Sequence, residues 1–295
     1  VYRNGTKVSY GSATSSIQSG LACGTSFAFG VEAVDAAGNR STQAQLNAST
    51  AACPVAPPPQ PPPPPVTPPT PSNTVWTANH ETGDLSQWNG QFNSDGGTSV
   101  ISIEQKHGGT YAARQNIDAD GTAGTRLRAF DSQGVPIVDG YYSVWLYIPH
   151  ASVTIPSTFN FMQWKGKVGS LNEVIWALYL HNRSDGSLFW RLSDKSGRVD
   201  ERPDQINYTD SPLTIPTQRW THLRVRYSIS AGFTGTVQVW QDGTLIYDKP
   251  NVNTAWASSE FARGYRVDWY INAYGAKITP FSYHHYIDDA VVASG

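Results

Sequence analysis

The stretch Arg266–Tyr274, "RVDWYINAY", alternates between two kinds of side chain. Successive side chains of a β-strand point to opposite faces, so such a stretch predicts a strand with one buried face. The apolar face carries Val267, Trp269, Ile271 and Ala273, and the other face carries Asp268, Tyr270, Asn272 and Tyr274. Two tyrosines among an acid and an amide indicate a surface that binds a ligand rather than one that only meets water.

The same period of two recurs through most of the chain after residue 73. It is present in "YYSVWLYIP", "FNFMQWKGK", "VIWALYLHN", "SLFWRLSD", "WTHLRVRYSIS", "GTVQVWQDGTLIYD" and "YHHYIDDAVVA". Turn signals such as Asp185-Gly186 and Asp242-Gly243 separate these segments, and helical periodicity is hard to find. Residues 74–295 are therefore predicted to form one all-β domain, a two-sheet jelly-roll sandwich.

The first part of the chain has a different character. Residues 54–73, "PVAPPPQPPPPPVTPPTPSN", are predicted to be a linker, because proline at this density cannot pair in a sheet or a helix. As polyproline II, at roughly 3 Å per residue, they would span about 60 Å. Residues 1–53 contain short strands and the turn signal Asn4-Gly5, which predict a separate small β domain. This domain opens in mid-strand, so we expect the chain to belong to a longer protein.

The composition excludes several classes of function. With 295 residues, of which 39% are hydrophobic and 15% charged, a soluble globular protein is expected. The net charge of −2 argues against nucleic acid as a partner, and no apolar run reaches the ~18 residues of a membrane span. We expect an extracellular monomer. In that setting Cys23 and Cys53 are expected to form a disulfide, although two free thiols are the alternative.

All ten tryptophans and all seven histidines follow residue 73, which assigns the function to residues 74–295. Parity collects three kinds of side chain opposite the predicted core. The cations are Arg126, Arg128, Lys165, Arg224 and Arg226, the rings are Trp145, Tyr147, Trp240, Tyr270 and Tyr274, and the amides are Gln163, Gln238 and Asn272. On one concave sheet, these groups would stack on sugars, bind hydroxyls and bind carboxylates or sulfates. The alternative is that the cations only solvate outer faces and the rings lie half-buried between the sheets.

Residues 20–41, "GLACGTSFAFGVEAVDAAGNRS", resemble the last two strands of a bacterial fibronectin type III domain. This resemblance identifies residues 1–53 as part of such a domain. It implies a role in spacing or adhesion rather than in chemistry.

A second resemblance covers nearly all of residues 74–295. The segments "NHETGDLSQW", "HGGTYAARQNI" and "YHHYIDDAVVASG" resemble the terminal strands of secreted jelly-roll carbohydrate domains. More narrowly, "YYSVWLYIP", "FNFMQWKGK", "WTHLRVRYSIS" and "TVQVWQDGTLIYD", in this order, resemble the concanavalin-like polysaccharide lyases, which include heparin lyase I and glucuronan lyase. The resemblance implies a concanavalin-like sandwich that acts on an acidic polysaccharide.

Lyases of this group cleave uronic acid polymers by β-elimination. A cation or amide neutralises the C5 carboxylate, a Tyr or His removes the C5 proton, and a Tyr protonates the departing O4. The segment "GTRLRAF" resembles the arginine strand of the family and offers Arg126 and Arg128 as carboxylate binders. The segment "MQWKGK" resembles the Q-x-H strand, in which Gln163 matches the amide and Lys165 stands in place of the histidine.

The opening stretch resembles the Y-F-K-x-G-x-Y strand of the family. Tyr274 matches the final tyrosine, whereas Tyr270 replaces the lysine and Asn272 the glycine. Tyr274 is our first choice for base and acid, and Tyr270 the second. An unperturbed tyrosine has a pKa of about 10, so either one would need neighbouring cations to act near neutral pH. His222 or His181 could supply the base instead.

A structural calcium ion is a further expectation from the jelly-roll resemblance. Glu81 follows the first strand of the domain, and Asp288 and Asp289 lie in the last. These carboxylates and the backbone carbonyls of residues 108–110 would provide the oxygen ligands that calcium prefers. The alternative is that these acids are simply exposed to solvent near the ends of the domain.

The sequence thus supports three hypotheses. The first is a secreted polysaccharide lyase that cleaves an anionic, uronic-acid-containing polysaccharide by β-elimination. The second is a non-catalytic carbohydrate-binding module, in which the chemistry has decayed and the binding face remains. The third is a structural domain whose aromatic face is packed shut. A hydrolase with two distant carboxylates also stays open.

Overall fold

The computed structural model describes residues 1–52, 73–117, 124–129, 139–168, 171–194, 206–230, 232–255, 266–275, 278–279 and 282–295. The chain divides into two compact units, Val1–Pro63 and Pro64–Gly295. Each unit is described by itself below. No helix in the described part of the chain is long and apolar enough to cross a bilayer.

The first unit is a small antiparallel sheet with the strand order β2-β1-β3-β4. Its strands are β1 (Tyr2–Arg3), β2 (Thr6–Lys7), β3 (Ser26–Val31) and β4 (Ala44–Ser49). Asn4 and Gly5 both have positive φ between β1 and β2, which is the hairpin turn that this dipeptide favours. Cys23 is in a disulfide, as expected. Cys53 and, apart from Asn73, the predicted linker lie outside the described residues. The fibronectin type III assignment stays a prediction.

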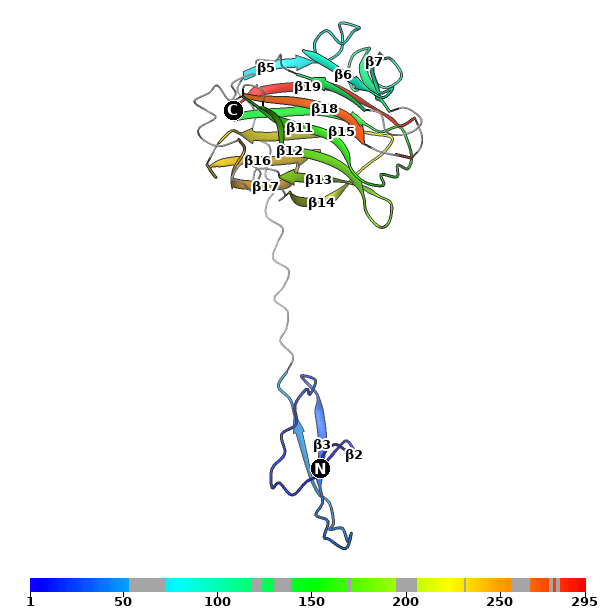
Figure 1. Ribbon diagram of the computed structural model, residues 1–295. Coiled ribbons are helices and arrows are strands. Elements are labelled where there is room, and N and C mark those ends of the chain that lie inside the picture. Colours follow the sequence, from blue (N-terminus) through cyan, green and yellow to red (C-terminus); the bar gives the residue numbers. More distant parts are fainter. Residues whose placement is uncertain are drawn as a thin grey trace. The chain divides into compact units, whose positions relative to one another are not determined.

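The second unit is a sandwich of two large antiparallel sheets (Figure 1), which confirms the predicted all-β fold. The eight-stranded sheet has the order β17-β16-β15-β10-β19-β8-β7, with β5 also paired to β19, and the seven-stranded sheet has the order β14-β13-β12-β11-β18-β9-β6. The eight-stranded sheet contains β5 (Asn73–Ala78), β7 (Thr98–Ser102), β8 (Ala112–Asn116), β10 (Asp139–Tyr147), β15 (Trp220–Ser228), β16 (Gly235–Gln241), β17 (Thr244–Val252) and β19 (His284–Ser294). The seven-stranded sheet contains β6 (Gly90–Ser94), β9 (Gly124–Arg128), β11 (Phe159–Val168), β12 (Leu171–Asn182), β13 (Leu188–Asp194), β14 (Asn207–Ile215) and β18 (Arg266–Gly275).

The core lies between the two sheets and is built from the apolar half of each alternating strand. From β18 it contains the predicted set Val267, Trp269, Ile271 and Ala273, each at most 1% exposed. The ring of Tyr142 on β10 lies 5.7 Å from that of Trp164 on β11 and 5.4 Å from that of Trp269, so aromatic contacts join the sheets. Each such fully buried side chain stabilises the fold by roughly 1.5–3 kcal/mol.

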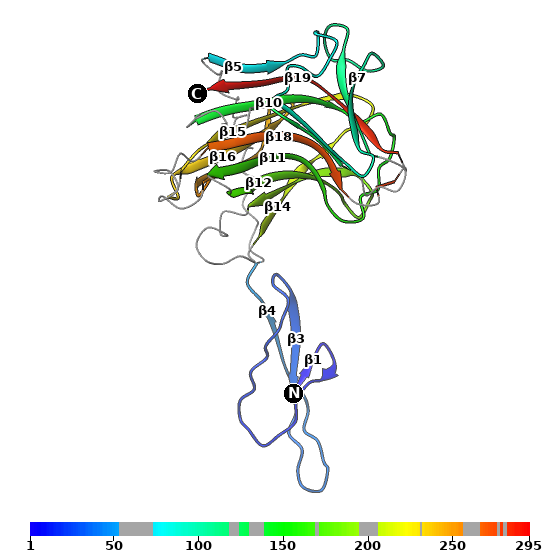
Figure 2. The same cartoon turned by 45° about the horizontal axis from the view of Figure 1, so that its top comes forward.

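Three neighbouring strands, β9, β18 and β11, position the polar half of the opening stretch. Figure 2 shows β18, β11 and β12 side by side. Residues paired across antiparallel strands point to the same face. Asn272 pairs with Arg126 on β9, and Tyr274 pairs with Asn160 on β11. A register shift between Asn160 and Met162 marks a β-bulge in β11, which changes the face that the following residues present.

Candidate functional site

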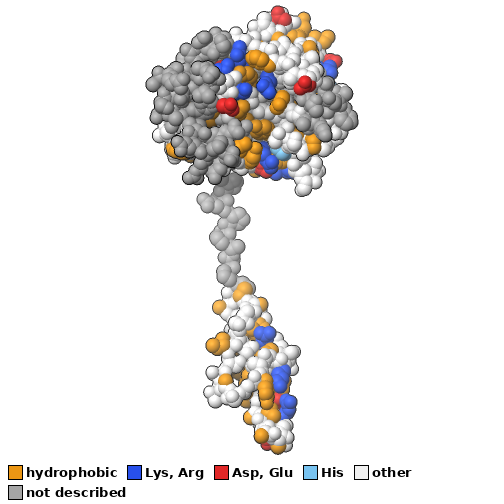
Figure 3. Space-filling view, in the orientation of Figure 1, with side chains coloured by type: hydrophobic (Ala, Val, Ile, Leu, Met, Phe, Trp, Pro, Cys, Tyr) orange, Lys and Arg blue, Asp and Glu red, His pale blue; other side chains and the backbone are white. Residues whose placement is uncertain are grey.

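A cavity of ≈ 240 Å³ lies on the polar face of the seven-stranded sheet. Its lining residues are Arg126, Thr158, Asn160, Gln163, Lys165, Val174, Tyr179 and Tyr274. In the view of Figure 3, Lys and Arg side chains gather beside hydrophobic ones over the region where Figure 1 draws β18 and β11. Four of the residues predicted for the site, Arg126, Gln163, Lys165 and Tyr274, are therefore brought together.

Tyr274 is the accessible phenol of this cavity, with 44% of its surface exposed. The guanidinium carbon of Arg126 lies 4.5 Å from the centre of its ring, a cation–π contact. The Tyr274 hydroxyl has no hydrogen-bond partner among the described residues. Gly124, its partner on β9, makes room for the ring, since a Cβ added to Gly124 would lie 2.3 Å from Tyr274 Cδ2.

Three buried amides form a hydrogen-bonded chain beside Tyr274. The Nδ2 of Asn272 donates to Oδ1 of Asn160 at 2.7 Å, and the Nδ2 of Asn160 donates to Oε1 of Gln163 at 3.0 Å. The Nε2 of Gln163 is buried and has no partner within the described part of the chain. A buried donor without a partner is costly, so a cavity that holds one is suited to a ligand with an acceptor.

Lys165 supplies a second cation to the cavity wall. Burial lowers its pKa from the ordinary value, and the positive charge of Arg126 lowers it further. Its Nζ lies 5.5 Å from the ring centre of Tyr270. Arg126 and Lys165 together make the cavity attractive to an anion.

Tyr270, the second choice for base and acid, has a different environment. It is 4% exposed, and its hydroxyl donates to Oδ2 of Asp268 at 3.1 Å. Burial, followed by the negative charge of Asp268, raises the pKa of Tyr270 to about 12. Asp268 is fully buried and also pairs with Lys167. Tyr270 does not line the cavity, so this environment suits a structural role better than proton transfer.

Arg128 lies one row away from the cavity. It pairs with Tyr270 in the strand register, and its Nη2 donates to the carbonyl oxygen of Asn89 at 3.0 Å. Its guanidinium carbon is 5.4 Å from the ring centre of Phe92. Of the two predicted arginines of β9, Arg126 is therefore the one placed to contact a ligand in this cavity.

The expectation of a single trough is wrong for seven of the predicted residues, which belong to the eight-stranded sheet. They are Trp145 and Tyr147 on β10, His222, Arg224 and Arg226 on β15, and Gln238 and Trp240 on β16. The core residues Val144, Leu223 and Val225 alternate with them, so this set points away from the sandwich on its opposite side. Parity shows that a side chain leaves the core, but not which sheet the strand joins.

Most of these seven residues also have protein partners of their own. Arg226 forms a two-pronged ion pair with Asp139, at 2.6 and 3.0 Å. The Trp145 ring stacks with His107 at 3.7 Å and with His222 at 4.7 Å. Burial lowers the pKa of His222 to about 4, so this histidine is neutral at physiological pH. It also belongs to the other sheet from the one that carries the cavity.

The two residues on β16, Gln238 and Trp240, are hydrogen-bonded and buried, respectively. The amide of Gln238 donates to Asp248 at 3.0 Å, and Trp240 is only 1% exposed.

His181, the other alternative base, lies on β12 of the seven-stranded sheet but does not line the cavity, and burial lowers its pKa. Its Nε2 lies 3.4 Å from Nη1 of Arg191.

Sequence reasoning missed Asn160 and Tyr179 in the cavity wall. A strict period of two sets Asn160 and Gln163 on opposite faces, because they are three residues apart. The bulge in β11 brings them to the same cavity. For Tyr179 a signal was present, since it alternates with the core residues Leu178 and Leu180. It is 9% exposed, and burial raises its pKa.

The carboxylates expected to bind calcium are close to the predicted turn but already accept hydrogen bonds. Glu81 accepts the backbone N–H groups of Thr110 and Tyr111, both at 2.9 Å, and Asp288 accepts those of residues 107 and 108 at 2.9 and 3.3 Å. The turn thus presents backbone donors to these two carboxylates. Asp289 contacts the His107 ring at 2.7 Å. In the described residues no group of three or more His, Cys, Asp or Glu side chains could hold a metal ion. Calcium binding therefore stays a prediction.

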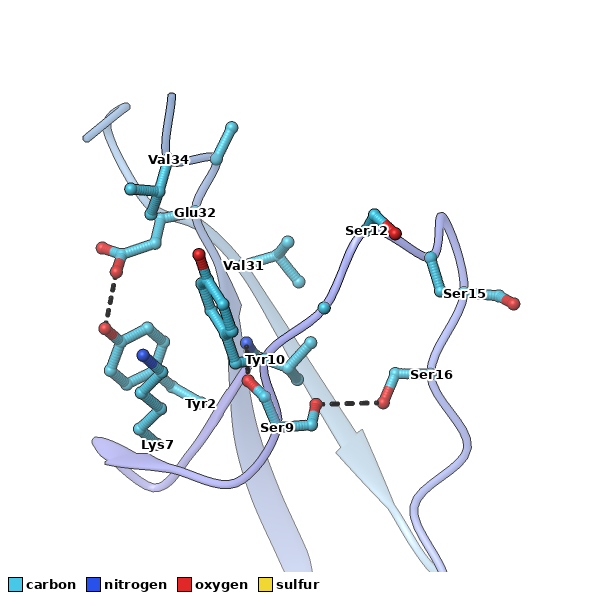
Figure 4. Close-up of a pocket in the computed structure, with 14 residues that line it drawn as sticks. Tyr2, Lys7, Ser9, Tyr10, Ser12, Ser15, Ser16, Val31, Glu32 and Val34 are labelled. Carbon is cyan, nitrogen blue, oxygen red and sulfur yellow. Dashed lines mark hydrogen bonds between the residues drawn. The ribbon is translucent and has the colours of Figure 1, made fainter. Parts of the chain in front are cut away.

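A cavity of ≈ 670 Å³ lies in the first unit, between the strands and the loop that follows β2 (Figure 4). The Tyr2 hydroxyl donates to Glu32 at 2.6 Å, and the Ser9 and Ser16 hydroxyls lie 3.3 Å apart. None of the predicted site residues lines it.

Comparisons with known proteins agree with the geometry. Residues 80–288 match the family described as polysaccharide lyase. The chain is similar to the structure of an endo-β-1,4-glucuronan lyase from the fungus Trichoderma reesei, with a TM-score of 0.58 and 14% identity over 75% of this chain and 96% of that one. It is also similar to alginate lyases from Aplysia kurodai (TM-score 0.51, 12% identity, 76% of this chain and 100% of that one) and from Chlorella virus (0.50, 9%, 76% and 100%). A comparison with curated proteins gives no match. At these identities the structural likeness concerns the fold alone.

Proposed function

Since the chain belongs to the polysaccharide lyase family, we propose that it cleaves an anionic, uronic-acid-containing polysaccharide by β-elimination. The family match confirms the resemblance inferred from the strand motifs. The fold relatives act on glucuronan and alginate, which are both uronic acid polymers, and this supports an acidic glycan as the substrate class.

One observation carries the proposal. A single cavity gathers a buried amide donor at Gln163 that has no partner among the described residues, two cations at Arg126 and Lys165, and the exposed side chain of Tyr274. β-Elimination requires these three functions together: a donor for the carboxylate, positive charge to stabilise the carbanion-like transition state, and a proton-transfer group.

In the proposed reaction the uronate carboxylate accepts a hydrogen bond from Nε2 of Gln163, with Arg126 and Lys165 balancing its charge. This arrangement makes the C5 proton acidic, because the negative charge that forms at C5 spreads onto a neutralised carboxylate. The Tyr274 oxygen removes the C5 proton. The C4=C5 double bond forms as the C4–O4 bond breaks, and Tyr274 returns a proton to O4 of the leaving chain. No water is consumed.

Tyr274→Phe is the direct test. The wild-type chain mixed with glucuronan or alginate should release products with an unsaturated end, which absorb near ~235 nm because the new double bond is conjugated with the carboxyl group. General acid–base groups contribute roughly 10²–10⁴-fold, so the variant should lose at least about a hundredfold in rate. Because Tyr274 is half exposed, the melting temperature of the Tyr274→Phe variant should stay near that of the wild type.

Tyr208→Phe is the matched control, since Tyr208 is a similarly exposed tyrosine (49%) on the edge strand β14 and does not line the cavity. It should keep full activity. Retention on immobilised acidic polysaccharide without any product would instead support the second function, a non-catalytic binding module. Equal activity of Tyr274→Phe and the wild type would refute the assigned role of Tyr274.

We further propose that the protein is extracellular and acts as a monomer. The disulfide at Cys23 supports an oxidising compartment such as the cell exterior.

A further inference from the structure

The chain of amides that ends at Gln163 has a direction. Asn272 donates to Asn160, and Asn160 donates to Gln163. The carbonyl end of the Gln163 amide is therefore used inside the chain, and its NH₂ end has no hydrogen-bond partner among the described residues, although Gln163 lines the cavity. The three residues are at most 7% exposed, so water competes little for these bonds.

The ends of a glutamine amide have nearly the same shape but opposite hydrogen-bonding roles. If the Gln163 amide rotated by half a turn, its carbonyl oxygen would face the ligand and repel a carboxylate. A fixed acceptor or donor elsewhere must therefore decide which end faces the cavity.

The charges around the chain favour the observed direction. Asn272 pairs with Arg126 in the strand register. Its Oδ1, which has no hydrogen-bond partner in the described part of the chain, therefore lies in the row that carries a guanidinium group. Reversing all three amides would turn the NH₂ group of Asn272 toward that row, where positive charge disfavours a donor. The Arg126 guanidinium on β9 thus favours the observed orientation of the Asn272 amide, which lies at the opposite end of the amide chain from Gln163.

We propose that Asn160 and Asn272 are positioning residues that hold Gln163 with its Nε2 toward the cavity, and that this polarity selects a carboxylate as the group bound there. The inference rests on the proposed function and deepens it. Asn160 and Asn272 act through Gln163 and need not touch the sugar themselves.

Asn160→Asp reverses the polarity with almost no change in shape. A carboxylate at position 160 accepts from both neighbours, so Gln163 must turn its Nε2 inward and present Oε1 to the cavity. Loss of one such donor typically costs 10²–10³-fold in rate, and we expect a fall in kcat/KM on glucuronan or alginate of roughly a hundredfold. Gln163→Met, which keeps the side-chain length without a donor, should fall by a similar factor.

The double variant Asn160→Asp/Gln163→Met distinguishes positioning from a merely structural effect. If Asn160 works only through Gln163, the double variant should be no slower than Gln163→Met alone, because there is no amide left to orient. Losses that multiply in the double variant would overturn the proposal, and so would an Asn160→Asp variant with full activity.

Asn160→Asp buries a charge, so its folding must be checked by circular dichroism and melting temperature. If it does not fold, Asn272→Leu takes its place, because it removes the first donor of the chain without adding charge. It should lower kcat/KM several-fold in the wild-type background and have no effect in the Gln163→Met background. An equal loss in both backgrounds would overturn the proposal.

A binding experiment shows which of the two proposals has failed. In it, a trisaccharide of the uronate polymer is titrated into the protein and the binding is measured by calorimetry. If the wild type binds it without forming product, β-elimination is refuted, and the same variants are compared by Kd. Asn160→Asp and Gln163→Met should then each bind roughly tenfold more weakly, without a further loss in the double variant. If the wild type neither cleaves nor binds, both proposals are overturned.

Discussion

Burial separates two tyrosines that the alternating pattern of the opening stretch treats alike. Tyr270 and Tyr274 share a face of β18, but Tyr270 is 4% exposed and Tyr274 is 44% exposed. The hydroxyl of Tyr270 donates a hydrogen bond to Asp268. The hydroxyl of Tyr274 has no hydrogen-bond partner among the described residues and is therefore available to a substrate. The same face of β18 therefore carries one tyrosine suited to packing and one suited to chemistry.

Lys165→Met should stabilise the fold and weaken function. Burial lowers the pKa of Lys165, so keeping it protonated at neutral pH costs free energy in the folded state but not in the unfolded state. Removing the charge should therefore raise the melting temperature. The gain should shrink as the pH rises toward the ordinary lysine pKa of about 10.4 and vanish above it, where the side chain is neutral in both states.

The same variant should raise KM for an acidic polymer roughly tenfold, equivalent to about 1.4 kcal/mol. Lys167→Met is the contrasting variant, because it leaves the fully buried carboxylate of Asp268 without its ion-pair partner. Its melting temperature should fall. A stabilising effect of Lys167→Met, or a destabilising one of Lys165→Met, would contradict this account; differential scanning calorimetry measures both.

At the scale of the strand, β9 determines where the Tyr274 ring can lie. A Cβ at position 124 would approach the ring to 2.3 Å, so Gly124→Ala must displace it. We expect kcat to fall at least tenfold while the melting temperature changes by only a few degrees, since the displaced ring is at the surface. Gly232→Ala is the control, because an added Cβ there meets nothing within 4 Å. Normal turnover by Gly124→Ala would show that the ring position is not critical.

The two sheets give a second prediction at this scale. Arg126 and Arg224 are both half-buried arginines on alternating strands, but only Arg126 lines the cavity. Arg126→Ala should reduce kcat/KM by at least tenfold, and Arg224→Ala should change it by less than twofold. Steady-state assays at 235 nm compare the two. A large loss in Arg224→Ala would mean that the eight-stranded sheet also contacts the substrate.

At the scale of the whole molecule, the sandwich buries histidines as neutral side chains. His285 is fully buried, and burial lowers its pKa to about 3, while His284 and His222 are lowered to about 4. His284 and His150 are the titratable groups that also depress the pKa of His285. In the unfolded chain all of them would titrate near 6.5.

Acid should therefore destabilise the protein before its carboxylates titrate. Between pH 6.5 and the lowered values the unfolded state binds more protons than the folded state, so stability is full above pH 6.5 and falls as the pH falls. The melting temperature should decrease from pH 7.5 to pH 5, and His285→Gln should make this decrease shallower. An equally steep decrease in His285→Gln would exclude His285 as a cause.

The family and the fold were already contained in the sequence. Alternation along β10, β15 and β18 identified the core side of each strand, as Trp269 and Ile271 confirm, because the pleat of a strand is a local property of the backbone. The match of Gln163, Arg126 and Tyr274 to lyase motifs also identified residues that share one cavity.

Which side chains actually face each other was decided only by the tertiary structure. Arg126 and Arg224 have the same local pattern but belong to different sheets, and the choice of sheet depends on pairings between strands far apart in the sequence. Asn160 reached the site through a bulge that breaks the period of two. The physical reason is that alternation is set by each strand's own backbone, whereas strand pairing, register and bulges are set by the packing of the whole sandwich.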